Sequence, residues 1–142
     1  MSNQIKIAAI LALIVGGVAY PALGQKKIQT IRVERIVSAY PNEQDHADVI
    51  TAKIISHLVK AGASVVEGAS DADTDAVLKV TYTERGNEDT GFHIEGPVRL
   101  TAIDGKIVWA DEVRTRMFTR NASDNFAEII AAKVAAFLAA QK

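Results

Sequence analysis

The chain has 142 residues, with 16 Lys and Arg against 17 Asp and Glu, and it contains no cysteine. The formal net charge of −1 argues against nucleic-acid binding, because domains that bind nucleic acids usually carry a clear basic excess. Without cysteine there can be no disulfide, thiolate nucleophile, zinc-thiolate site or iron–sulfur cluster, so packing must stabilise the fold.

The first residues have the pattern of a secretory signal peptide. Lys6 precedes an apolar run over residues 7–19, and Pro21 and Ala22-Leu23-Gly24 follow as a cleavage site would. We therefore predict cleavage before Gln25. Because Gln25 stands where a lipoprotein would have its acylated cysteine, a bacterial lipoprotein is not expected.

Cleavage divides the chain into a signal peptide over residues 1–24 and one domain over residues 25–142, an ordinary length for a single domain. The expected location is then periplasmic or secreted. The alternative is that residues 7–24 remain as a membrane anchor, since a membrane-spanning helix needs about 20 apolar residues.

A strand and then a helix are predicted at the start of the domain. Residues 28–37 are rich in β-branched side chains, which is typical of a strand. Asn42 or Asp45 is expected to cap the start of the helix, and Gly62 its end. The helix is indicated by apolar residues at three- and four-residue steps, with others beside them: Ala47, Val49, Ile50, Ile54, Ile55, Leu58 and Val59.

Residues 64–67 are predicted as a short strand. Residues 76–84 alternate between apolar and polar side chains, which indicates a strand with one buried and one solvated face. Residues 85–91 are predicted as a loop, and another strand contains the alternating Val98, Leu100 and Ala102.

Asp104-Gly105 predicts a two-residue hairpin turn with positive backbone angles, followed by a long strand over residues 106–118. Asn121 or Ser123 is expected to cap a last helix on the same face of the sheet as the first. The apolar side chains of that helix recur with helical spacing: Phe126, Ile129, Ile130, Val134, Phe137 and Leu138.

The predicted order β-α-β-β-β-α indicates an α+β fold, with a mixed sheet of four to five strands and two helices on one face. The stretch at 72–78 and the hairpin at 103–109 resemble bacterial cell-envelope domains. These include the amino-terminal domain of TolB, the penicillin-binding-protein activator lipoproteins and the curli-secretion lipoprotein domain. The resemblance implies an anticodon-binding-like sandwich and a non-catalytic envelope module that binds another protein.

No metal site is predicted from the acidic loop. Asp71, Asp73 and Asp75 alternate as at the start of a calcium loop, but Ala76 and Tyr82 occupy the positions of the required Gly and Glu. A solvated acidic loop is the simpler interpretation.

The histidines do not suggest a catalytic centre. His46 and His57 lie about three turns apart on one predicted helix, about 16 Å along its axis, and so are too distant to share a metal. His93 and Glu95 share one strand face, but no third ligand or nucleophile is marked by spacing. Neither a nucleophile elbow nor a phosphate-binding loop occurs in the sequence. We predict no enzyme activity and no catalytic, cofactor or metal site.

The strand alternation does predict an interaction face. Lys79, Arg99, Arg114 and Arg116 are expected on the sheet face away from the helices, together with Thr81, Thr83 and Thr101, which line the same face. Such a face is suited to an acidic envelope protein or an anionic envelope polymer, whereas an ordinary solvated face is the alternative interpretation.

The sequence therefore predicts an exported, non-enzymatic cell-envelope domain that acts through protein binding. An accessory subunit of a membrane complex, held by an uncleaved N-terminal helix, is the second hypothesis. A small hydrolase or metal enzyme is the third.

Overall fold

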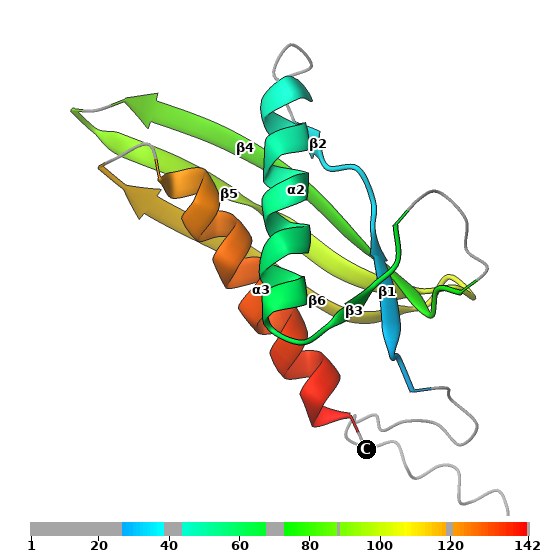
Figure 1. The fold of residues 1–142 in the computed structure, drawn as a ribbon. Coiled ribbons are helices and arrows are strands. Elements are labelled where there is room, and N and C mark those ends of the chain that lie inside the picture. The colour runs from blue at the N-terminus through cyan, green and yellow to red at the C-terminus, as the bar shows by residue number, and fades with distance from the viewer. Residues whose placement is uncertain (1–26, 39–43, 68–72, 88, 119–120, 142) are drawn as a thin grey trace, which may run out of the picture.

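The computed structural model describes residues 27–38, 44–67, 73–87, 89–118 and 121–141 (Figure 1). The predicted signal peptide or anchor lies outside the described residues and stays a prediction. The described elements follow in chain order: β1 (Thr30–Val33), β2 (Val37–Ser38), α2 (Gln44–Lys60), β3 (Ser64–Val65), β4 (Ala76–Asn87), β5 (Gly91–Ala102), β6 (Ile107–Met117) and α3 (Ala122–Ala140). None of the described helices is long and apolar enough to cross a membrane.

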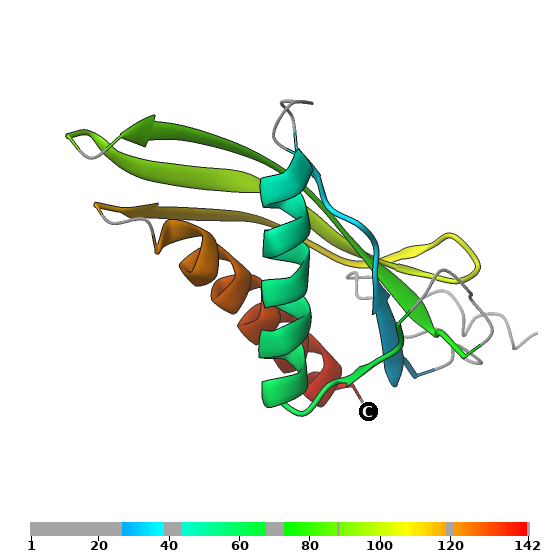
Figure 2. The same ribbon diagram turned by 45° about the horizontal axis from the view of Figure 1, so that its top comes forward.

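The strands form one mixed sheet in the order β3-β1-β4-β5-β6, with β2 also paired to β4. β1 pairs in parallel with β3 and β4, and the long strands β4, β5 and β6 form an antiparallel meander. Both helices lie on the same side of this sheet (Figure 2). The predicted α+β class and the single helical layer are therefore confirmed.

The sheet has six strands rather than the predicted four to five, because the first predicted strand is broken. β1 pairs with β4, and the last hydrogen bond of this part is donated by the amide of Glu34 to the carbonyl of Leu78. The chain then leaves the sheet and pairs with β4 again at β2. The prediction of one continuous strand over residues 28–37 was therefore wrong, since a composition rich in β-branched residues does not specify where strand pairing stops.

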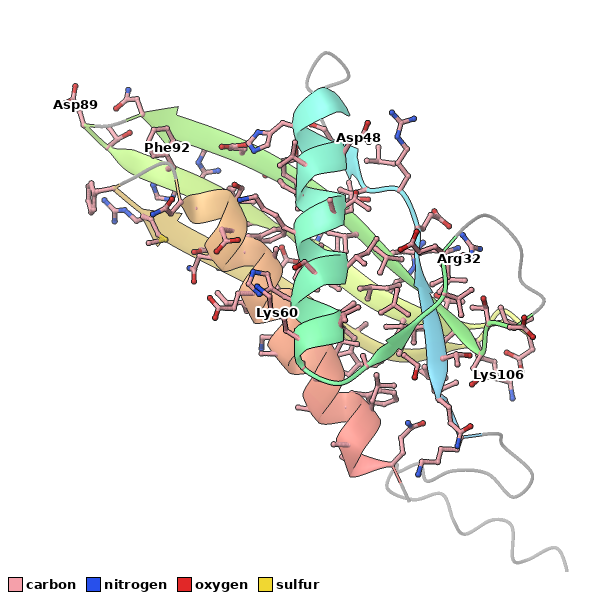
Figure 3. The ribbon with its side chains drawn as sticks, viewed as in Figure 1. Arg32, Asp48, Lys60, Asp89, Phe92 and Lys106 are labelled. Atoms are coloured by element: carbon pink, nitrogen blue, oxygen red, sulfur yellow. The ribbon has the colours of Figure 1, made fainter. Side chains whose placement is uncertain are left out.

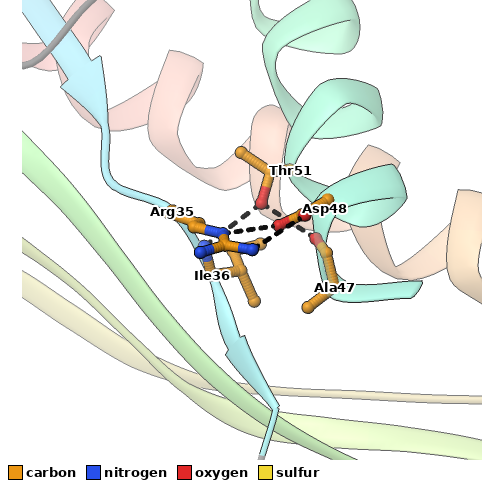
Figure 4. Close-up of polar contacts among 5 residues, drawn as sticks. All are labelled: Arg35, Ile36, Ala47, Asp48 and Thr51. Atoms are coloured by element: carbon orange, nitrogen blue, oxygen red, sulfur yellow. Dashed lines mark hydrogen bonds and ion pairs between the residues drawn. The ribbon is translucent and has the colours of Figure 1, made fainter. Parts of the chain in front are cut away.

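Two contacts tie this interrupted segment to α2 (Figure 4). Arg35 forms a two-pronged ion pair with Asp48, with nitrogen to oxygen distances of 2.8 and 3.0 Å. Thr51 Oγ1 accepts a hydrogen bond from the amide of Ile36 and donates one to the carbonyl of Ala47. The link between β1 and β2 is thus held against the first turns of the helix.

The core lies between the sheet and the two helices. Buried side chains come from α2, α3 and the facing side of the meander: Ile50, Ile54, Leu58, Phe126, Ile130, Val134, Leu78, Val80, Tyr82, Ile94, Val98 and Leu100. Two residues of the predicted apolar stripe of α2 do not join them, because Val49 and Val59 are 50% and 58% exposed. The apolar face of α2 is therefore narrower than predicted.

Aromatic side chains from the sheet meet those of α3 in and beside the core. Tyr82 and Phe126 are fully buried, with ring centroids 6.3 Å apart. Trp109 also faces the helices, and its ring centroid is 6.5 Å from that of Phe137. Trp109 is only half-buried because it packs near the end of α3, at the margin of the core.

The helix ends agree with part of the sequence prediction. α2 ends in a Schellman motif, in which the amide of Gly62 bonds the carbonyl of Val59 and the amide of Ala63 bonds that of Leu58. Asp45 lies inside α2 and is not its cap, while Asn42 is outside the described residues. Asn121 occupies the cap position of α3 without a side-chain capping bond, and Ser123 is buried within the helix.

Both hairpins differ from their predictions. Residues 85–87 and Gly91 belong to strands and not to the predicted loop, because β4 continues to Asn87 and β5 begins at Gly91. At the second hairpin the amide of Gly105 bonds the carbonyl of Ala102, the amide of Ala102 bonds the carbonyl of Lys106, and only Gly105 has a positive φ. This is a three-residue loop built on a type I turn, so Asp104 needs no left-handed conformation.

Candidate functional site

The sheet face away from the helices carries all four predicted interaction residues. The register places Lys79 opposite Arg99, Glu95 opposite Arg114 and His93 opposite Arg116. Residues directly opposite one another share a face of the sheet. We call this surface the outer sheet face and define it by eleven residues of β4, β5 and β6: Lys79, Thr81, Thr83, Arg85, His93, Glu95, Arg99, Thr101, Glu112, Arg114 and Arg116. Their common position is as predicted, and their role in binding stays a prediction.

Positive side chains face one another directly across the strands. Lys79 and Arg99 are a register pair, and no ion pair among the described residues involves either of them. Like charges directly opposite one another destabilise a sheet. This arrangement is therefore unfavourable for folding.

A row of two arginines with a histidine between them crosses three neighbouring strands. Arg85 lies opposite His93, and His93 lies opposite Arg116. Arg116 is held in place because its guanidinium donates to the carbonyl of Thr90 at 3.3 Å and its Cζ lies 5.1 Å from the centroid of the Phe118 ring. The Phe118 side chain is itself exposed, which adds an apolar group beside this row.

Acidic residues compensate only part of this charge. Glu95 and Glu112 are the acidic members of the outer sheet face. Arg114 Nε lies 3.9 Å from Glu95 Oε1, a contact longer than a hydrogen bond, and the Arg114 side chain is 73% exposed. An excess of positive charge thus remains on a protein whose formal net charge is −1.

The helical side of the sheet holds two pairs of histidine and carboxylate that sequence reasoning missed. His46 Nδ1 lies 3.1 Å from Glu84 Oε1, and His57 Nε2 lies 3.2 Å from Asp124 Oδ1. Because each pair joins residues far apart in the sequence, no local spacing could have indicated it. Both predicted histidines of α2 are thus involved in contacts between elements.

These pairs do not assemble a catalytic constellation. His46 and Glu84 line a cavity of about 250 Å³ together with Phe92 and Ala122, which contribute no nucleophile. A second cavity, of about 480 Å³, lies between the starts of β1 and β3 and the end of α3, and its lining is dominated by small and apolar residues. Among the described residues no group of His, Asp and Glu is arranged to hold a metal ion.

The acidic loop before β4 has a structural role in its described part. Asp75 Oδ2 accepts hydrogen bonds from the backbone amides of Gln29 and Thr30, at 2.8 and 3.0 Å. This carboxylate therefore fixes the start of β1 beside β4. Asp73 is exposed, and Asp71 lies outside the described residues. His93 and Glu95 share the outer sheet face as predicted.

The architecture is that of an α+β sandwich with one helical layer. No protein-family model matches this sequence, and neither does any curated protein sequence. The chain is similar in fold to the PelC dodecamer from Paraburkholderia phytofirmans, with a TM-score of 0.62 and 18% identity over 88% of this chain and 96% of that one. It is also similar to a hypothetical protein from Chlamydia trachomatis, with a TM-score of 0.64 and 9% identity over 79% of this chain and 99% of that one.

At these identities the similarity shows the fold alone. A minor lipoprotein from Acinetobacter baumannii is less similar, with a TM-score of 0.48 and 16% identity over 78% of this chain and 94% of that one. The more specific resemblance to the TolB amino-terminal domain and to penicillin-binding-protein activators stays a prediction from sequence.

Proposed function

We propose that this chain is a non-enzymatic domain of the bacterial cell envelope, and that its outer sheet face binds an acidic region of another envelope protein. The predicted signal peptide supports export. The fold shared with PelC, whose solved form is a dodecamer, supports a role in protein association.

The observation that carries the proposal is the direct pairing of Lys79 with Arg99. Since such a pair opposes folding, its presence at the centre of an open sheet face needs another reason. Binding of an acidic partner supplies that reason, because the partner would neutralise both charges at once. Surfaces that bind often sacrifice stability in this way.

A protein partner fits this surface better than a simple polyanion. The outer sheet face combines arginine side chains with the exposed Thr81, and exposed apolar groups adjoin it at Phe118 and at Val37, which lies beside Thr81. Arginine and aromatic residues are enriched at protein interfaces. A uniformly charged polymer would have no use for the apolar groups.

The test compares two variants that each remove two positive charges. Lys79→Gln with Arg99→Gln changes the outer sheet face, and Lys60→Gln with Lys106→Gln is the matched control at the end of α2 and at the β5–β6 turn (Figure 3). Each protein is immobilised and exposed to native envelope extract at increasing salt. We expect the outer-face variant to lose its partner, because the cationic pair is gone, and the control to retain it.

The melting temperature makes this test specific. The outer-face variant should melt at the same temperature as the native chain or higher, because a repulsive pair is removed. Binding by the native chain should weaken with salt, since exposed charges are screened beyond about 8 Å at physiological ionic strength. Equal capture of the partner by both variants would show that the outer sheet face is not the binding surface. Capture of a protease-resistant polymer would show that the partner is not a protein.

A further inference from the structure

The sheet has one edge that is long and open. β6 is the last strand in the sheet order, and its far side pairs with no described strand. Its eleven residues, Ile107–Met117, include neither proline nor glycine. The opposite edge is β3, which has only two residues. Natural proteins protect open edges by making them short or by inserting proline, and β6 has neither protection.

Charged side chains are the remaining protection on β6, and their order makes them self-complementary. Glu112 and Arg114 flank Val113 and point to the outer sheet face. In an antiparallel pair of two identical strands centred on Val113, Glu112 of each copy lies opposite Arg114 of the other. Opposite charges placed in this way stabilise paired strands.

We propose that β6 is a homodimer interface, at which two copies of this chain pair antiparallel about a two-fold axis through Val113. The two sheets then form one continuous sheet. An isologous contact of this kind closes on itself and produces a dimer, not a fibre.

The neighbouring registers are disfavoured by charge. Residues opposite one another across the new interface must lie on the same face of the sheet. The two-fold axis must therefore pass through a residue, and the alternative registers are those centred on the neighbouring residues. A centre on Glu112 places that carboxylate opposite its own copy, and a centre on Arg114 does the same for the guanidinium. A centre on Asp111 repeats the problem, and one on Thr115 places Arg114 opposite Arg116. The Val113 centre avoids like pairs and creates two opposite ones.

The helical side of the edge is compatible with this pairing. In the Val113 register, Trp109 of one copy lies opposite Met117 of the other, and both side chains pack against the core. Lys133 of α3 reaches over the edge strand to Asp111, with a nitrogen to oxygen distance of 2.8 Å.

Arg114 is available for the new contact. Its long 3.9 Å approach to Glu95 and its 73% exposed side chain leave the guanidinium free to reorient toward the edge. Pairing would also join two outer sheet faces into one surface, so that a partner with two acidic segments could bind both copies.

The test uses charge exchange in the full chain, with mass measured by sedimentation equilibrium across a range of protein concentrations. Glu112→Arg alone and Arg114→Glu alone should each weaken dimerisation about tenfold or more, because two attractive pairs become repulsive in one step. Combining Glu112→Arg with Arg114→Glu restores opposite charges and should restore the dimer. Arg99→Glu, on the same face but in the interior strand β5, is the control and should leave the dimer unchanged.

Recovery of the dimer in the double exchange is the decisive result. If a single variant lost the dimer only because it failed to fold, a second charge change would not restore the dimer. Far-ultraviolet circular dichroism checks that each variant is folded. A native chain that stays monomeric at every concentration, a native chain that forms only larger rings, or a double exchange without recovery would each overturn the proposal.

Discussion

Asp124 joins the two helices through a single carboxylate. It lies within 3.2 Å of His57 Nε2 and 3.6 Å of Lys53 Nζ, both on α2, although the Asp124 side chain is itself 49% exposed. The hydrogen bond with His57, helped by the positive charge of Lys53, holds the pKa of Asp124 below its ordinary value. The ionised carboxylate is therefore more stable in the folded chain than in the unfolded one.

This lowered pKa gives a prediction about acid. The stabilisation from Asp124 is fully present above its unfolded pKa of about 4 and is lost as the pH falls through the lower folded pKa. Asp124→Asn should thus destabilise the fold at neutral pH by less than about 1 kcal/mol, since the pair is partly solvated. Urea unfolding of both proteins from neutral to strongly acidic pH should show this difference shrinking with acid.

Glu128→Gln removes an acidic side chain from an exposed site on the same helix and serves as the control. A difference between the native chain and Asp124→Asn that stays constant down to the lowest pH would show that the carboxylate charge is not what connects the helices.

The helices were easier to predict than the strands. Apolar spacing in α2 and α3 is set by the 3.6-residue turn, and their predicted inner positions are buried or partly buried, apart from the exposed Val49 and Val59. The strand ends were harder because pairing is made by the backbone, which has the same groups in every residue. Residues 85–87 continue β4 toward a hairpin tip that projects beyond α2 (Figure 1), where little core is available to require alternating apolar residues.

The central part of the β4–β5 hairpin depends on the small size of Gly96. A Cβ atom added there would lie 1.9 Å from the backbone carbonyl oxygen of Thr81 and 2.8 Å from the Cα of Tyr82. Backbone atoms inside a sheet cannot move away cheaply, so Gly96→Ala should cost about 3 kcal/mol or more. Thermal unfolding measures this directly.

Gly105→Ala is the matched comparison, because a Cβ there meets nothing within 4 Å. Its cost arises only from the left-handed backbone and should be about 1 to 2 kcal/mol. Equal stability of Gly96→Ala and Gly105→Ala would show that the backbones of β4 and β5 do not approach this closely at Gly96.

For the molecule as a whole, the sequence could predict which residues share a face of the sheet, because this depends only on the two-residue period of a strand. Lys79, Arg99, Arg114 and Arg116 were placed on one face because alternate residues of a strand point the same way. Which of these residues face one another was not predictable, since register depends on the exact hairpin geometry. Arg85 was missed for the same reason, because its segment was taken for a loop.

The long-range pairs were beyond any local pattern. Sequence spacing does not indicate that His46 meets Glu84 or that Asp75 binds the start of β1, because each contact depends on how distant elements pack. The like-charged pair of Lys79 and Arg99, on which the proposed function depends, also became visible only with the register.

Site-specific photo-crosslinking in the native cell tests the binding role of the outer sheet face most directly. A photoreactive residue replaces Thr81 or Thr83 on that face, or Ala52 or Ser56 on the exposed side of α2 as controls. We expect the two outer-face positions to capture the same acidic envelope protein and the two helix positions not to capture it. Capture of a partner from Ala52 or Ser56, with none from Thr81 or Thr83, would contradict the proposed binding role.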